Sequence, residues 1–229
     1  MLIVLFSLFL IYVKCKSQDP ITVILDDEQE LDDSDEELPT YTHTVDLEGL
    51  ADVSTPASAL RHFQQDIIEE GGPSQRFTVC RLDGLCDLRK DIMGIYKNPN
   101  TNLRVKPKVR FEEEDGVGSG PIREFLSNVI KVVDDGIPSG NKPLIFLEGE
   151  KDHRLPIHDQ SLRLIGTFKA IGRMIGHSIL HGGPGLTGLS PAAIHYLTTE
   201  REGQQPPPLA IEDIADIELR QLITEVCHI

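Results

Sequence analysis

The clearest pattern in the chain is a stripe of apolar residues at helical spacing that follows Pro121. Intervals of three and four residues place these positions on one face of a helix: Ile122, Phe125, Leu126, Val129, Ile130 and Val133. Proline suits the first turn of a helix, where its missing N–H needs no partner. Gly136 follows the stripe and ends it, so the sequence predicts a helix over 121–135 with one buried face.

A second long stretch of helical spacing covers residues 160–181. Its apolar positions are Leu164, Phe168, Ile171, Ile175, Ile179 and Leu180. The glycine pair at 182–183 provides the left-handed stop that commonly ends a helix. Gly172 and Gly176 lie one turn apart inside the stretch, and glycine costs helix stability. Their presence therefore favours the close approach of another backbone at this face.

Shorter patterns complete the prediction of secondary structure. Strands are expected at 76–80, 103–105, 108–111 and 143–147, with Pro107 marking an edge or a bulge because proline cannot donate to a ladder. Further helices are expected at 61–70, 83–96, 191–199 (after a Ser190-Pro191 cap) and 211–226. The predicted fold is α+β, mostly helical, with a few short strands.

Charge divides the chain into regions. Residues 19–37 hold ten acidic side chains and no Lys or Arg, and they carry most of the net charge of −15. We therefore expect an apolar N-terminal segment at 1–17, an acidic and largely disordered region at 18–75, and a folded domain at 76–229. An acidic chain repels phosphate backbones, so no nucleic-acid partner is expected.

The N-terminal segment and the cysteines bear on location. Residues 1–13 are almost wholly apolar but too short to span a bilayer. A secretion signal requires a basic residue before its apolar stretch, and this segment has none. The four cysteines form no C-x-x-C pair, which favours free thiols in a reducing compartment: Cys15, Cys80, Cys86 and Cys227. We expect a cytoplasmic or nuclear protein without a membrane partner, and a secretory protein if residues 1–17 act as a signal.

Three patterns of chemical interest are incomplete. His177 and His181 lie one helical turn apart, but no Glu stands between them and no third ligand has a diagnostic spacing. They are expected at the helix surface or as partners of backbone carbonyls. Ser119 lacks the Gly-x-Ser-x-Gly frame of a hydrolase, and no Lys-Ser/Thr follows the glycine run at 116–120. No metal, cofactor or catalytic residue is expected from these patterns.

The acidic region contains a pattern that resembles a SUMO-interacting motif. Such motifs add an extended apolar strand to a sheet edge, and neighbouring acids meet a basic rim. The candidate contact residues are Ile21, Val23, Ile24, Asp26, Asp27 and Glu28. Ser34, among acids, fits an acid-directed phosphorylation site that would add charge. The alternative is an ordinary apolar run in a disordered tail.

Four blocks of the folded region, in order and at matching spacing, resemble the HECT domain of ubiquitin ligases. They are residues 109–125, 143–149, 168–182 and 189–191. The family positions within them are Gly120, Arg123, Glu124, Phe125, Gly172, Arg173 and Gly176. The likeness is closest to the G2/M-phase-specific ubiquitin ligase group, and it covers the first part of the amino-terminal lobe, about residues 76–226.

The resemblance implies a ubiquitin-protein transferase, with a ubiquitin-conjugating enzyme and ubiquitin as partners. In that family the conjugating-enzyme site and the thioester-forming cysteine come later in the domain, so no catalytic residue is expected in this chain. Cys227 stands in the wrong place for that nucleophile. A non-catalytic scaffold, or a binding protein of the SUMO or ubiquitin pathway, is the alternative.

The Arg-Glu-Phe block also makes physical sense at a helix start, and the resemblance shows one departure. Glu124 suits the positive end of a helix, Phe125 anchors the buried stripe, and Arg123 is expected to reach a carboxylate elsewhere. Val117 and Ser119 stand where the family has an acid and a first glycine. A partial lobe is further expected to expose apolar faces.

Overall fold

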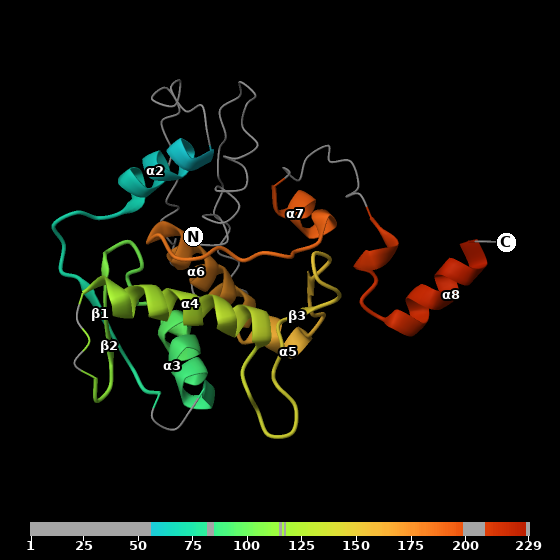
Figure 1. The fold of residues 1–229 in the computed structure, drawn as a ribbon, viewed down its shortest axis with the longest axis horizontal. Coiled ribbons are helices and arrows are strands. Elements are labelled where there is room, and N and C mark those ends of the chain that lie inside the picture. The colour runs from blue at the N-terminus through green and yellow to red at the C-terminus, as the bar shows by residue number, and fades with distance from the viewer. Residues whose placement is uncertain (1–55, 82–84, 115, 117, 199–208, 228–229) are drawn as a thin grey trace, which may run out of the picture.

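The computed structural model describes residues 56–81, 85–114, 116, 118–198 and 209–227. It is a mixed α/β structure in which helices make up about half of the described residues and the strands are few and short. Figure 1 shows the arrangement of α2 (Pro56–Ile67), β1 (Gln75–Val79), α3 (Leu85–Lys97), β2 (Pro107–Phe111), α4 (Ser119–Asp135), β3 (Leu147–Glu148), β4 (Leu155–Pro156), α5 (Gln160–Leu164), α6 (Thr167–Leu180), α7 (Pro191–Thr198), the 3₁₀ helix η2 (Ile211–Asp213) and α8 (Ile217–Cys227).

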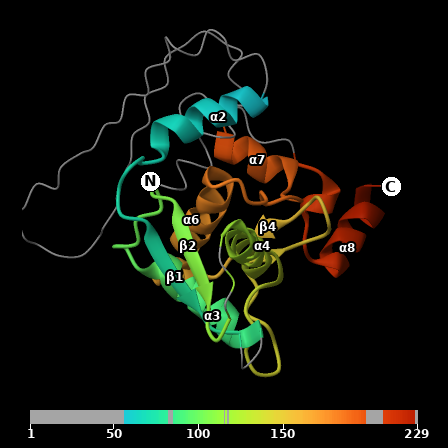
Figure 2. The same ribbon diagram turned by 60° about the vertical axis from the view of Figure 1, so that its left-hand side comes forward.

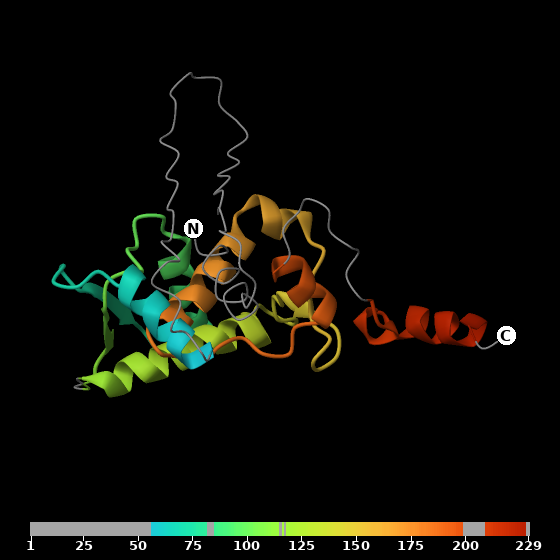
Figure 3. The same cartoon turned by 90° about the horizontal axis from the view of Figure 1, so that it is seen from above.

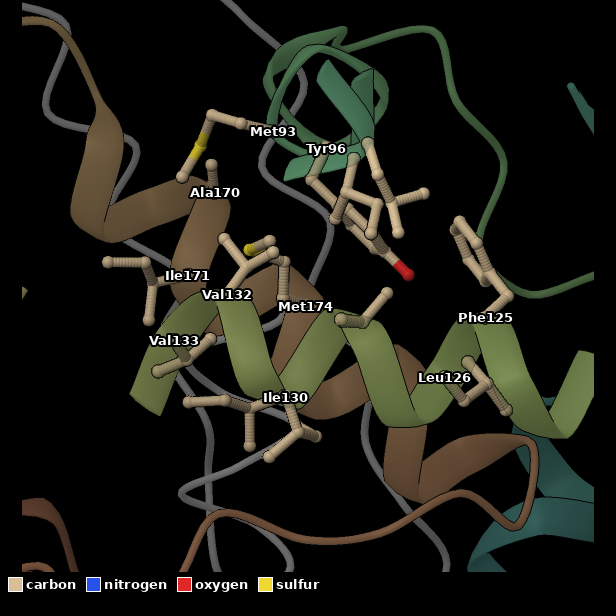
Figure 4. Packing of buried hydrophobic residues seen from close by; sticks show 14 of the residues in the cluster. Met93, Tyr96, Phe125, Leu126, Ile130, Val132, Val133, Ala170, Ile171 and Met174 are labelled. Carbon is tan, nitrogen blue, oxygen red and sulfur yellow. The ribbon is translucent and has the colours of Figure 1, made fainter. Parts of the chain in front are cut away.

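The core lies where α4 packs against α6 and α3. The apolar stripe predicted for α4 is confirmed, because Phe125, Leu126, Val129, Ile130 and Val133 are all buried. Figure 4 shows side chains of α3 and α6, among them Tyr96 and Met174, directed toward those of α4. The helix begins two residues before Pro121, which still lies in the first turn, where a missing N–H costs nothing. Gly136 caps its C-terminus as predicted.

The two strands β1 and β2 pair in parallel, with Phe77 beside Val109. The side chains of Phe77, Val79 and Phe111 point inward and are buried against the helices. Figure 2 shows the two strands side by side on one flank of the body. Pro107 is the first residue of β2, a position where an edge strand tolerates proline.

The strand predicted at 103–105 is absent. Leu103 and Val105 are buried, but the backbone bends between them. The side chain of Asn102 accepts a hydrogen bond from the N–H of Arg104 at 3.0 Å. This local turn offers the backbone a partner that competes with a strand ladder.

The single helix predicted over 160–181 is two helices. Gly166, with φ of 68°, ends α5 and precedes α6. Because a left-handed residue breaks the α-helical ladder, the apolar face does not continue across it. Leu164 is consequently 74% exposed, whereas Ile171, Ile175 and Ile179 of α6 are buried as predicted.

The prediction of a buried strand at 143–147 is also wrong. Leu144 forms an isolated bridge to Ile137, and of residues 143–147 only Leu147 belongs to a regular strand, β3, which pairs with β4. Of the five residues, Phe146 is buried at 1% exposure, while Leu144 and Ile145 are 39% and 41% exposed. Two backbone hydrogen bonds between Ile137 and Leu144, of 2.9 and 2.8 Å, hold the chain here. Gly136 permits this approach, because a Cβ at that position would lie 2.1 Å from the carbonyl oxygen of Leu144.

Side-chain hydrogen bonds at helix termini hold α7 and α2 in place. Ser190 accepts a hydrogen bond from the N–H of Ala192 at 3.0 Å and caps α7 as predicted. The helix expected at 61–70 is α2, and its Gln64 amide donates to the carbonyls of Ile179 and Leu180, each at 3.1 Å. Both carbonyls lie in the last turn of α6, where the regular ladder of the helix ends, and these bonds make α2 part of the folded body.

The helix predicted at 211–226 is interrupted. The 3₁₀ helix η2 comes first, and α8 starts again where Asp216 accepts the N–H of Leu219 at 3.0 Å, the geometry of an N-cap. Figure 3 shows α8 extending away from the rest of the structure. Among the described residues, no helix combines the length and the apolar character needed to cross a membrane.

Candidate functional site

A polar pair lies in the middle of the core, between α3 and α6. A hydrogen bond of 2.6 Å joins the hydroxyl of Tyr96 to Nδ1 of His177. Both side chains are fully buried. Tyr96 lies one turn after Ile92 on the apolar face of α3, and His177 lies between the buried positions Met174 and Leu180 of α6.

Two further polar side chains, one on α6 and one at its C-cap, lie near this pair. The ring of His181 lies 4.6 Å from that of His177, and its Nε2 contacts the carbonyl oxygen of Leu103 at 2.9 Å. The guanidinium of Arg173, a residue of the family motif, donates to the carbonyl oxygen of Thr101 at 3.0 Å. The two histidines and Arg173 therefore bind α6 to α3 and to the segment after it.

Burial sets the protonation of the pair. Burial, followed by the nearby His181 and Arg173, holds the pKa of His177 well below its ordinary value of 6.5. Burial raises the pKa of Tyr96 well above 10.0, against the opposing effect of Arg173. Both groups are neutral near pH 7, and the Nε2 atom of His177 has no hydrogen-bond partner among the described residues.

The two histidines differ in how they compare with the prediction. His181 is the partner of a backbone carbonyl, as expected, whereas His177 is in the core and not at the helix surface. A nitrogen of each ring is already engaged within the protein. In the described part of the chain, no three His, Cys, Asp or Glu side chains gather as a metal site would require.

A second cluster lies at the surface, where α4 begins. The guanidinium of Arg81 hydrogen-bonds to the carboxylates of both Glu114 and Glu124, and it stacks over the ring of Phe111 at 4.4 Å. The hydrogen bonds that Arg81 donates to Glu114 raise the pKa of Arg81, an effect partly offset by desolvation. Arg81 thereby joins the end of β1, the turn after β2 and the second turn of α4. Glu124 was expected at the positive end of the helix, but α4 begins at Ser119 and has no acidic residue in its first turn.

The residues of the Arg-Glu-Phe block take different roles. Phe125 is fully buried, as predicted, and its ring stacks on that of Phe77 at 5.4 Å. Glu124 forms the ion pair with Arg81. Arg123 is exposed and forms no ion pair among the described residues, so the structure does not show the carboxylate contact expected of it.

The family glycines also divide into two kinds. Gly172 and Gly176 are buried in α6, which packs on α4 and α3. Gly120 lies in the first turn of α4, where an added Cβ would meet no atom within 4 Å. The turn before it depends on Gly118, whose φ of 93° strongly favours glycine.

An apolar groove lies beside the core, between α2, the end of α6 and α7. It has a volume of about 430 Å³ and is lined by Leu60, Ile179, Gly182, Gly183, Gly185, Leu186, Thr187, Gly188, Leu189 and Ile194. That volume falls within the usual range of ligand sites. Its lining has no ionisable side chain, so the groove offers no group for acid–base chemistry.

Several sequence predictions fall outside the described residues. They include the SUMO-type residues Ile21, Val23, Ile24, Asp26, Asp27 and Glu28, the phosphorylation site at Ser34, and the side chain of Cys227. Conversely, the sequence analysis missed Tyr96 and Arg81. Tyr96 had a usable signal, its place on the predicted helix face, but neither sequence position indicates a partner on another element.

Comparison with known proteins adds no assignment to this geometry. No model of a known protein family matches the chain, and no curated protein matches it either. The described residues define a mixed α/β body with a neutral Tyr–His pair at its centre and an ion-paired helix start at its surface.

Proposed function

We propose that this chain takes part in ubiquitin transfer as a member of the HECT family, with residues 76–226 forming part of an amino-terminal lobe. One observation supports the proposal above the others. The helices that carry the Arg-Glu-Phe block and the Gly-Arg block, α4 and α6, pack against each other in one core. The resemblance requires this arrangement, since both blocks belong to the same lobe.

The motif residues support the same proposal through their structural roles. Phe125 fills the core, Glu124 fastens the start of α4 to Arg81, and Arg173 fastens α6 to the segment that follows α3. None of them lines the apolar groove. They are suited to hold a framework in shape, which is the role of a lobe that positions a conjugating enzyme relative to a catalytic cysteine.

In the complete family enzyme, ubiquitin passes from a conjugating enzyme to a cysteine and then to a substrate lysine. The residues of this chain that match the family do not include that cysteine. We therefore propose a framework role without thioester chemistry of its own, in the cytoplasm or nucleus and without a cofactor.

A thioester assay tests the chemical part of the proposal. The purified chain is incubated with a ubiquitin-charged conjugating enzyme, and products are separated with and without dithiothreitol. We expect no reducible adduct, because Cys227 matches no family nucleophile. A reducible adduct that disappears in the Cys227→Ala variant would contradict the proposal.

The family assignment itself is tested by the transcript downstream of the codon for Ile229. We expect it to encode the rest of an amino-terminal lobe and then a lobe with a cysteine. An unrelated downstream domain would argue against the assignment. The longer product would then be assayed for transfer of ubiquitin to a lysine, with its cysteine replaced by alanine as the control.

A further inference from the structure

The outer face of the β1–β2 sheet carries a strip of cations. Arg76 of β1 and Lys108 and Arg110 of β2 are exposed and alternate with the inward side chains of their strands. The parallel register places Arg76 directly beside Lys108, and Thr78 beside Arg110. These three cations, Arg76, Lys108 and Arg110, are called the basic strip below.

The basic strip has no counter-charge of its own. Like charges directly side by side on a sheet are destabilising, and among the described residues none of the three forms an ion pair. By contrast, Arg81, Arg89, Arg154 and Arg220 are each paired with a carboxylate. An unpaired cationic strip stands out in a chain whose net charge is −15.

The surrounding acids indicate how a ligand would lie on this strip. Glu112 and Glu113 are exposed just beyond the end of β2, and Glu114 is engaged by Arg81. The positive field is therefore strongest at Arg76 and Lys108, away from these acids. An extended segment with several carboxylates matches such a strip, because its charges are spread along the strands.

We propose that the acidic segment 26–37 of this same chain docks on the basic strip. This segment has nine acidic residues and no Lys or Arg. It is joined to α2 by residues 38–55, and an extended connection of that length reaches about 60 Å. Such a tether also supplies a local concentration of about millimolar, so weak individual ion pairs suffice.

Docking would regulate what the acidic segment contacts. Asp26, Asp27 and Glu28 belong both to the segment and to the SUMO-type pattern. Carboxylates held by the strip are not free for a partner with a basic rim, so the docked form competes with such a partner. Phosphorylation at Ser34 adds charge to the segment and favours the docked form. The inference stands without the proposed function, because it rests on charge and register alone.

The test compares the full chain with a variant in which all nine acids of 26–37 are replaced by Asn or Gln. This variant alters no described residue, so the folded body is unchanged by design. We expect backbone amide shifts to differ between the two proteins mainly at 75–79 and 107–111. The difference is expected to vanish at about 0.5 M NaCl, where exposed charges are screened within about 5 Å.

A second pair of variants tests the contact by changing the basic strip instead of the acidic segment. Arg76→Glu/Lys108→Glu/Arg110→Glu is expected to release the segment, so that the amides of 26–37 relax like those of an isolated acidic peptide. The matched control, Lys131→Glu/Lys142→Glu/Lys151→Glu, makes the same charge change at exposed positions elsewhere and is expected to keep the segment docked. If the strip variant does not fold, the comparison of the full chain with the variant neutralised at 26–37 tests the proposal by itself.

Two results would overturn the proposal. One is the absence of shift differences at the two strands when the acids are neutralised. The other is a set of differences that grows with protein concentration, because it would place the segment on a second copy. Shifts at the strands that are independent of concentration and lost at high salt support docking within one chain.

Discussion

The helices α4 and α8 both carry an apolar stripe, but only one of the two is covered. In α4 the stripe faces α3 and α6, and Phe125 and Val129 are wholly buried. In α8, Leu219, Leu222 and Val226 share one face and are 47%, 59% and 70% exposed. An apolar stripe therefore defines which face of a helix is apolar, but it does not define what covers that face.

The two helices also differ in how they are fastened. α4 is held by apolar packing along its length. α8 is held near its start by Arg220, which donates to the carbonyl of Ile214 and pairs with Glu150. The preceding η2 is fastened by Asp213, where burial raises the pKa but hydrogen bonds from the Ala210 N–H, His153 and Ser190 outweigh it and lower the pKa.

Truncating one residue in each stripe should change the free energy of unfolding by very different amounts. Phe125→Ala removes a fully buried ring and leaves a cavity, so we expect the free energy of unfolding to fall by about 3–5 kcal/mol. Leu222→Ala, on the exposed face of α8, is expected to stay within about 0.5 kcal/mol of the parent. Urea denaturation followed by circular dichroism measures both. Equal losses would mean that α8 is covered in solution.

A smaller effect is expected from the glycine that lets the end of α6 approach α4. A Cβ on Gly183 would lie 2.7 Å from that of Leu126 and 2.5 Å from Oγ of Ser178. Gly183→Ala should therefore cost about 1–3 kcal/mol through overpacking. Gly120→Ala is the matched control, because its Cβ enters open space. An unchanged midpoint for Gly183→Ala in urea would show that the two helices are farther apart.

The smallest expected effect appears in the dependence of stability on pH. The pKa of His177 is lower in the folded protein than its unfolded value near 6.5, so the unfolded state binds the proton first as the pH falls. Stability is then full above about pH 6.5 and is lost below it, by about 1.4 kcal/mol per pH unit for one such group. His181, whose pKa is also lowered by burial, adds in the same direction.

Denaturation midpoints between about pH 7.5 and 5.5 test this dependence. His177→Gln removes the group and keeps a polar side chain for Tyr96, so its slope is expected to be shallower than that of the parent. His158→Gln, at an exposed position, is expected to keep the slope of the parent. Identical slopes in both variants would show that His177 is reached by solvent.

Local patterns predicted much of the fold but failed wherever a turn interrupted a long pattern. The stripe of α4, the stop at Gly136 and the cap at Ser190 are confirmed, because each depends on neighbours in sequence. Gly166 was overlooked inside an apolar stretch, and Asp216 inside another, and each starts a new helix. A residue that can restart a helix is visible in the sequence, but its effect competes with the continuing apolar period.

The candidate site was less accessible to prediction from the sequence. The burial of His177 depends on Tyr96, 81 positions earlier in the chain, and the fastening of Glu124 depends on Arg81. By itself the sequence determined which faces of its helices are apolar, where most of them end, and how its charge is divided. Only the tertiary structure decided which face is covered and which polar group is paired, because burial and hydrogen bonding join residues that are distant along the chain.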